Sequence, residues 1–150
     1  MQLLAPIVLV EDDANDALFV RQALVAAQIA NPLVEFTSAE EARHNVTMFA
    51  APNAPVVLFI LDVHLSGNES GLDLLRWLRL QAPPLGSTPA IVLTGSDSPA
   101  HSAESSRLGA MGFLRKPVTE DTLTEAVRSL GFQVVTSLVS GRMQFRIERR

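Results

Sequence analysis

The sequence predicts an α/β fold in which a doubly wound, five-stranded parallel sheet is followed by a C-terminal β-hairpin extension. Three observations predict this class. Five short apolar runs alternate with longer amphipathic segments over about 130 residues, which is the order of repeated βα units. Some of these runs are apolar throughout, as strands covered on both faces are. The last 19 residues instead contain runs typical of strands and do not fit a sixth helix.

The first two βα units follow from apolar runs and from residues typical of helix ends. Pro6–Val10 predicts a strand that is buried on both faces. Asp13–Gln28 predicts a helix, because its apolar residues have near-helical spacing and its first turn is acidic. Asn31-Pro32 ends this segment, and Leu33–Phe36 predicts a short strand. Ser38 predicts the N-cap of the second helix.

Three further βα units follow. We expect their strands at Val56–Leu61, Ala90–Leu93 and Met111–Leu114. We expect their helices directly after Gly71, at Asp97–Leu108 and at Thr119–Leu130. The helix after Gly71 should direct Leu72, Leu75, Trp77 and Leu78 toward the core. Right-handed βαβ connections then place helices on both faces of the sheet.

The extension, residues 132–150, predicts a hairpin. Val134–Val139 favours a strand, Met143–Glu148 alternates apolar and polar residues, and the turn between them contains Gly141. The alternating apolar residues of the second strand are Met143, Phe145 and Ile147. Because one apolar face of such a hairpin has to be covered, either the domain or a second chain lies against it. We expect a homodimer formed through this face.

Composition excludes several classes of protein. A chain of 150 residues with 47% hydrophobic and 19% charged residues is long enough for one folded domain and is not a disordered segment. The absence of cysteine excludes disulfides, thiolate zinc sites and cysteine nucleophiles. No apolar run approaches the roughly 20 residues of a bilayer span, and the N-terminus lacks the basic leader of a signal peptide. We therefore expect a soluble, cytoplasmic protein with no membrane partner.

Charge is unevenly distributed along the chain. The net charge of −4 argues against nucleic acid as the main partner. Residues 1–131 contain 8 basic and 15 acidic residues, net −7, whereas residues 132–150 contain four arginines and one glutamate, net +3. This basic end either meets an acidic surface or is solvated. Lys116 is the single lysine among twelve basic residues, which suggests that its position requires a compact ammonium group.

Polar residues follow four of the expected strands at the edge where open parallel sheets bind their ligands. They are Glu11, Asp12 and Asp13 after the first strand, Asp62 after the third, Thr94 after the fourth and Lys116 after the fifth. Each of these alone has an ordinary explanation, such as helix capping, a turn or a solvated surface. Together they bring carboxylates, a hydroxyl and an ammonium group to one rim, which indicates a functional site.

With these residues in place, the chain resembles the receiver domain of two-component response regulators. The motifs are Leu9–Asp13, Phe59–Asp62, Gly71–Leu75, Leu93–Gly95 and Gly109–Pro117. The resemblance runs from Ile7 to Leu130 and implies a flavodoxin-like (βα)5 receiver fold, with residues 1–131 as the receiver domain. Asn31–Val34 and Ala39–Ala42 further resemble the small stand-alone regulators that accompany bacterial phytochromes.

The resemblance implies a phosphoacceptor and a metal site. Asp62 would accept a phosphoryl group from a sensor histidine kinase, with a bacterial phytochrome as the implied kinase. Glu11, Asp12, Asp62 and the backbone carbonyl of His64 would bind Mg²⁺, whereas Asp13 is a third acid outside the metal-binding pair. A cation is needed because two carboxylates about 4 Å apart repel by about 4 kcal/mol at an effective dielectric constant near 20. For His64 we expect only the backbone to matter.

The resemblance also implies a switch. Lys116 would contact a phosphoryl oxygen, Thr94 would move its hydroxyl toward the phosphate, and Phe113 would change rotamer in response. The chain departs from the family pattern in three places. The loop from Asp62 to Gly71 is one residue longer than is common, Ser66 stands where proline is usual, and Phe113 replaces the commoner tyrosine.

These roles favour a single-domain response regulator that is not an enzyme, beyond slow Mg²⁺-dependent self-dephosphorylation at most. The 20 residues after Leu130 are too few for a DNA-binding output domain, so output would use protein contacts. A pseudo-receiver that never carries phosphate remains the alternative, supported by the altered loop. An aspartate-nucleophile hydrolase of the haloacid-dehalogenase type expects its nucleophile in the first strand and a second Asp two residues later, where this chain has His64. An FMN binder expects a phosphate loop after the first strand, which is missing.

Overall fold

The computed structural model describes residues 4–46, 55–95, 99–129, 131–139 and 141–148. Strands and helices alternate along these ranges as expected. In chain order they are β1 (Ile7–Val10), α1 (Ala14–Ala26), β2 (Leu33–Phe36), α2 (Ala39–Asn45), β3 (Leu58–Asp62), α3 (Gly71–Arg79), the 3-10 helix η2 (Leu85–Ser87), β4 (Ala90–Thr94), α4 (Pro99–Arg107), β5 (Gly112–Arg115), α5 (Glu120–Ser129), β6 (Gln133–Val139) and β7 (Arg142–Glu148). The predicted fold class is confirmed.

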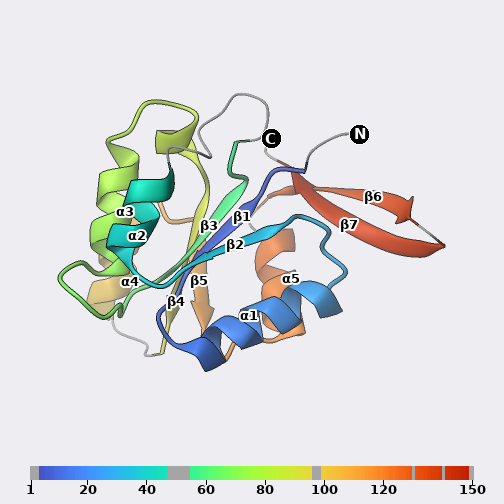
Figure 1. The fold of residues 1–150 in the computed structure, drawn as a ribbon, viewed down its shortest axis with the longest axis horizontal. Coiled ribbons are helices and arrows are strands. Elements are labelled where there is room, and N and C mark those ends of the chain that lie inside the picture. Colours follow the sequence, from blue (N-terminus) through green and yellow to red (C-terminus); the bar gives the residue numbers. More distant parts are fainter. Residues whose placement is uncertain (1–3, 47–54, 96–98, 130, 140, 149–150) are drawn as a thin grey trace.

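One parallel sheet contains the first five strands, in the order β2-β1-β3-β4-β5. The chain leaves β1 toward β2 and then returns across β1 to β3, so the strand order reverses beside β1. Helices α1 and α5 cover one face of the sheet, whereas α2, α3 and α4 cover the other (Figure 1). The sheet is therefore doubly wound, and the reversal of strand order beside β1 marks the carboxyl edge at which sheets of this kind bind ligands.

Each face of the sheet packs its own apolar core. Within β1, Ile7 and Leu9 belong to the cluster beneath α1 and α5, whereas Val8 and Val10 belong to the cluster beneath α2 and α3. All four residues are fully buried. This explains why the predicted strands are apolar without alternation. Burial of a side chain of this size contributes about 2 kcal/mol, so the two clusters hold the strand ends firmly in place.

Several element boundaries differ from the sequence expectation. Helix α1 ends at Ala26 rather than Gln28, because Gln28 adopts a left-handed conformation with φ of 59°. Strand β3 begins two residues later than expected and includes Asp62. Strand β5 is shifted by one residue, to Gly112–Arg115. The expected ends of the last two helices at Asp97 and Leu130 lie outside the described residues.

The extension forms the predicted antiparallel hairpin, in which Leu138 lies opposite Met143 and Val134 opposite Ile147. The hairpin projects from the end of the sheet where the strands begin (Figure 1). Strand β7 binds the segment after α1 through two backbone hydrogen bonds of Phe145, one to Gln28 O (2.8 Å) and one from Ala30 N (2.6 Å).

The domain itself covers part of the apolar face of the hairpin. Ile147 is 1% exposed and belongs to the core beneath α1 and α5. Asn31 binds both backbone groups of Ile147, because its Nδ2 donates to the carbonyl (3.0 Å) and its Oδ1 accepts from the N–H (2.6 Å). At the far end of the same face, Leu138 is 74% and Met143 51% exposed. Of the expected alternating residues, only Met143 therefore remains largely uncovered.

None of the helices in the described ranges is both long enough and apolar enough to cross a lipid bilayer.

Candidate functional site

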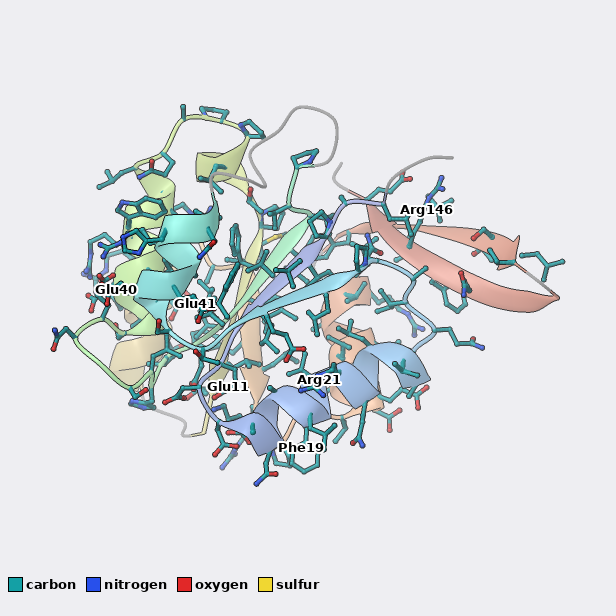
Figure 2. All side chains as sticks on the ribbon, in the orientation of Figure 1. Glu11, Phe19, Arg21, Glu40, Glu41 and Arg146 are labelled. Carbon is teal, nitrogen blue, oxygen red and sulfur yellow. The ribbon has the colours of Figure 1, made fainter. Side chains whose placement is uncertain are left out.

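The carboxyl ends of the strands bring the predicted acidic residues together. Glu11 follows β1 directly (Figure 2), and Asp62 is the last residue of β3. Oxygens from the carboxylates of Glu11, Asp12 and Asp62 lie within 4.8 Å of one another. Glu11 and Asp62 are buried, whereas Asp12 is exposed at the opening. The cluster therefore has a closed floor and one side that faces solvent.

Lys116 lies at the centre of this cluster. Its Nζ is 3.0 Å from Asp62 Oδ2, 2.9 Å from Glu11 Oε2 and 3.0 Å from Asp16 Oδ2. The contact with Glu11 is an ion pair without hydrogen-bond alignment, because Glu11 Oε2 is buried and has no hydrogen-bond partner. The backbone N–H of Lys116 donates to the backbone carbonyl of Thr94 (2.9 Å), which fixes the start of the lysine side chain beside β4.

The electrostatics follow from burial and from these pairs. The pKa of Glu11 is raised to about 7, chiefly by burial and also by neighbouring Asp62, against the lowering effect of Lys116. For Lys116, burial alone would lower the pKa, but its contacts with Glu11, Asp16 and Asp62 outweigh burial and raise the pKa above its usual range. The lysine is therefore a fixed positive charge, whereas Glu11 readily exchanges a proton near neutral pH.

Two features position Asp62. The backbone N–H of His64 donates to Asp62 Oδ1 (3.1 Å), so that Asp62 Oδ2 faces Lys116. Helix α3 begins directly against the Asp62 backbone, since a Cβ on Gly71 would lie 1.9 Å from Asp62 O. Ser70 caps α3 in a capping box with Asp73. Glycine is thus required at 71, and the helix start fixes the end of β3.

The departure from the family pattern at Ser66 has a structural consequence. The Ser66 N–H donates to Asp12 Oδ2 (2.9 Å). Proline has no N–H and could not make this bond. Burial alone would raise the pKa of Asp12, but the hydrogen bonds from Ser66 outweigh it and lower the pKa below its usual value. The longer loop therefore holds Asp12 ionised at the opening.

The remaining expected residues lie around this centre. Asp13 is the N-cap of α1 and accepts from the N–H groups of Asn15 and Asp16 (both 2.9 Å), so it serves the helix. Thr94 is buried at the end of β4. Phe113 is half-buried in β5 and packs against the core beneath α2 and α3. The side chain of His64 is exposed.

Sequence reasoning did not single out Asp16. Its position in the first turn of α1 is sufficiently explained by the helix dipole, and its contact with Lys116 joins residues 100 positions apart. Its spacing could have identified it, because Asp16 lies three residues after the N-cap Asp13, in the first turn of the helix that follows the acidic cluster.

The cluster fits a small divalent cation. Three carboxylates supply hard oxygen donors, one of them open to solvent, and Mg²⁺ is bound in proteins through a few carboxylates and several waters. Glu11, Asp12 and Asp62 are the residues that could hold it, and the buried, unaligned Glu11 Oε2 has capacity for such a ligand. The same oxygen chemistry makes Asp62 a potential nucleophile toward phosphorus.

The chain is similar to known proteins in both sequence and fold. Residues 7–128 match the family model described as response regulator receiver domain. Among solved structures, the bacteriophytochrome response regulator RtBRR is 26% identical, with a TM-score of 0.77 over 92% of this chain and 86% of that chain. The bacteriophytochrome response regulator AtBRR is 28% identical, with a TM-score of 0.74 over 91% of this chain and 98% of that chain.

A relative among curated proteins is the transcriptional regulatory protein FixJ of Bradyrhizobium diazoefficiens. It is 31% identical over 80 residues, which are 53% of this chain and 37% of FixJ. The matched region is thus a minor part of that protein.

Proposed function

Because this chain belongs to the response regulator receiver domain family, we propose that it accepts a phosphoryl group on Asp62 from a histidine kinase and signals through protein contacts. The observation that carries the proposal is the buried Asp62 carboxylate, with Lys116 3.0 Å away and the carboxylates of Glu11 and Asp12 beside it. Residues 4–129 contain the described parts of this site and of the sheet that supports it.

The proposed reaction is a transfer between a phosphohistidine and Asp62. A carboxylate oxygen of Asp62 attacks the phosphorus, the P–N bond breaks, and its electron pair returns to the imidazole of the kinase. The product is an acyl phosphate on Asp62. Lys116 neutralises negative charge on the transferring oxygens, because its ammonium stays charged at any physiological pH. Each chain accepts one group, so it acts as a stoichiometric acceptor rather than a catalyst.

We propose Mg²⁺ as the cofactor, held by Glu11, Asp12, Asp62 and the backbone carbonyl of His64. When bound, the ion would offset the repulsion between three carboxylates and an incoming phosphoryl group. The residues of this chain orient the carboxylates. The backbone N–H of His64 binds one oxygen of Asp62, and the backbone N–H of Ser66 binds one oxygen of Asp12.

The similarity to RtBRR and AtBRR supports a finer assignment of the partner. Both are named as bacteriophytochrome response regulators. We therefore assign a bacterial phytochrome as the kinase that phosphorylates this chain. Transfer from the autophosphorylated kinase domain of such a phytochrome, faster than from an unrelated histidine kinase, is the expected result.

We also propose a homodimer formed through the β6–β7 hairpin. Leu138 and Met143 lie opposite each other on one hairpin face and are 74% and 51% exposed. Side chains of this kind favour burial in an interface. Light scattering across a concentration series measures this, with a Leu138→Ser/Met143→Ser variant as the control. A monomer whose mass does not change with concentration, with and without phosphorylation, refutes the dimer.

The central experiment is phosphorylation by acetyl phosphate with Mg²⁺, followed by intact mass. We expect one phosphoryl group on the wild type and none on Asp62→Asn or without Mg²⁺. Asp121→Asn, an exposed carboxylate in the first turn of α5, is the matched control and should behave as the wild type. No adduct on the wild type under rapid quenching would instead support the pseudo-receiver alternative.

A further inference from the structure

The ammonium group of Lys116 is surrounded by as many carboxylates as it has N–H groups. An ammonium carries three donors. Its three acidic neighbours are Glu11, Asp16 and Asp62, at 2.9 to 3.0 Å. Asp16 and Asp62 accept hydrogen bonds from Nζ, whereas Glu11 is ion-paired with it without hydrogen-bond alignment. A phosphoryl oxygen that binds Lys116 therefore competes with these carboxylates for the ammonium.

Of the three, Asp16 is the neighbour that can leave at the lowest cost. Its side chain is 28% exposed, whereas those of Glu11 and Asp62 are 0% and 2% exposed. A carboxylate at the surface regains water when it loses its partner, but a buried one does not. Asp62 is also the residue that would carry the phosphoryl group.

Capping of α1 does not account for the orientation of Asp16. Three residues after the N-cap, its carboxylate could close a capping box with the Asp13 N–H. That N–H instead donates to Glu11 Oε1 (3.1 Å), and Asp16 Oδ2 accepts from Lys116 (3.0 Å). The side chain is thus directed across the site toward the lysine.

We propose that Asp16 is a positioning residue that holds Lys116 in the resting chain and competes with the phosphoryl group for its ammonium. This role rests on the proposed phosphorylation of Asp62. It gives a specific order of contacts: Lys116 leaves Asp16 when the phosphoryl group arrives and keeps its contact with Glu11. Asp16 therefore weakens anion binding at the site and slows phosphorylation.

The single lysine makes the ammonium directly observable. Labelling with [15Nζ]lysine gives one side-chain signal, because Lys116 is the only lysine in the chain. We expect Asp16→Asn to shift this signal in the resting protein. With Mg²⁺ and fluoroberyllate, a tetrahedral phosphoryl mimic, the wild-type and Asp16→Asn signals should coincide, because Asp16 no longer holds the lysine. Signals that remain as far apart as in the resting state would overturn the proposal.

Asp13→Asn is the matched control. It removes one negative charge from the same helix start and keeps an oxygen for capping, yet Asp13 does not contact Lys116. We expect Asp16→Asn to bind fluoroberyllate and to be phosphorylated by acetyl phosphate about twofold to fivefold more readily than the wild type, the upper part of the range for an exposed ion pair. Asp13→Asn should change both by less than about twofold.

The outcomes separate this proposal from the proposed function. A wild type that forms no adduct refutes phosphorylation and this role with it. A wild type that is phosphorylated while Asp16→Asn matches it, or while Asp13→Asn shows the same gain, refutes the role of Asp16 alone. Both variants should unfold at the same temperature as the wild type. That result would show that the altered reactivity arises at the site and not from a loss of stability.

Discussion

Replacing Asn31 with alanine should detach the β6–β7 hairpin from the sheet. Asn31 is 6% exposed, and its side chain makes three hydrogen bonds at one point. Its Nδ2 donates to Ala5 O (2.9 Å) and to Ile147 O (3.0 Å), and its Oδ1 accepts from the Ile147 N–H (2.6 Å). The two bonds to Ile147 are buried, so water cannot take the place of the amide without movement of β7.

The expected loss follows from what the alanine leaves behind. A buried donor or acceptor without a partner costs about 1 to 3 kcal/mol, and Asn31→Ala creates two such groups on Ile147. The combined cost is about 3 kcal/mol, of the same order as the burial of Ile147 itself. We therefore expect β7 to separate from the body while the five-stranded sheet stays folded.

Two measurements test this. Amide hydrogen exchange at Ile147 should accelerate about 100-fold, the equivalent of about 3 kcal/mol at 1.36 kcal/mol per factor of ten. Urea unfolding followed by circular dichroism should give a lower free energy of unfolding. Asn45→Ala, which removes one exposed bond to Glu41 O on α2, is the control and should cost less than about 1 kcal/mol. Unchanged exchange at Ile147, or equal losses in the two variants, would refute the reasoning.

Three further perturbations address the site and its support. Gly71→Ala places a Cβ 1.9 Å from Asp62 O and should lower the free energy of unfolding in urea by about 3 kcal/mol. Gly95→Ala is the control and should be near neutral, because the space around Gly95 is open. Equal stabilities of the two variants would contradict the requirement for glycine at 71. Arg79→Met removes hydrogen bonds to four backbone carbonyls and should cost about 2 kcal/mol or more; a smaller loss in the same assay would mean that water replaces the guanidinium. The pKa of Glu11 is raised from 4.5 to about 7, so the metal-free folded chain binds a proton that the unfolded chain lacks between these values; this stabilisation is complete below pH 4.5 and is lost as pH rises through 7. The difference in free energy of unfolding between the wild type and Glu11→Gln, measured from pH 4.5 to 8, tests this pH dependence. Parallel stability curves for the two proteins would argue against it. Protonation of Glu11 should also lower the Mg²⁺ affinity below pH 7.

The sequence predicted those parts of the molecule that short-range patterns specify. Apolar runs placed the strands because burial on both faces removes alternation, as in β1. The acidic cluster was predictable because parallel strands end at one edge, whichever residues lie between them. The hairpin was predictable from alternation and from Gly141, which adopts a φ of 76°.

The contacts that the sequence did not predict are long-range. Asn31 was interpreted as a helix breaker, but it binds Ile147, 116 residues later. Asp16 matched the helix dipole, and nothing local distinguishes that role from its contact with Lys116. The end of α1 was missed because Gln28 takes a conformation that glycine or asparagine more often adopts. In each case the neighbouring sequence already explained the residue, so nothing in the sequence indicated its distant partner.

The hairpin and the acidic cluster lie at opposite ends of the same strands. Asn31 precedes β2 and Ala5 precedes β1, whereas Glu11 follows β1, a strand of four residues and about 13 Å. No hydrogen bond described between the hairpin and the body involves a residue of the cluster. Evolution could therefore lengthen, exchange or discard the hairpin, and with it the proposed dimer, while the acidic cluster stays unchanged. Conversely, substitutions in the acidic cluster can alter its chemistry while the hairpin stays unchanged.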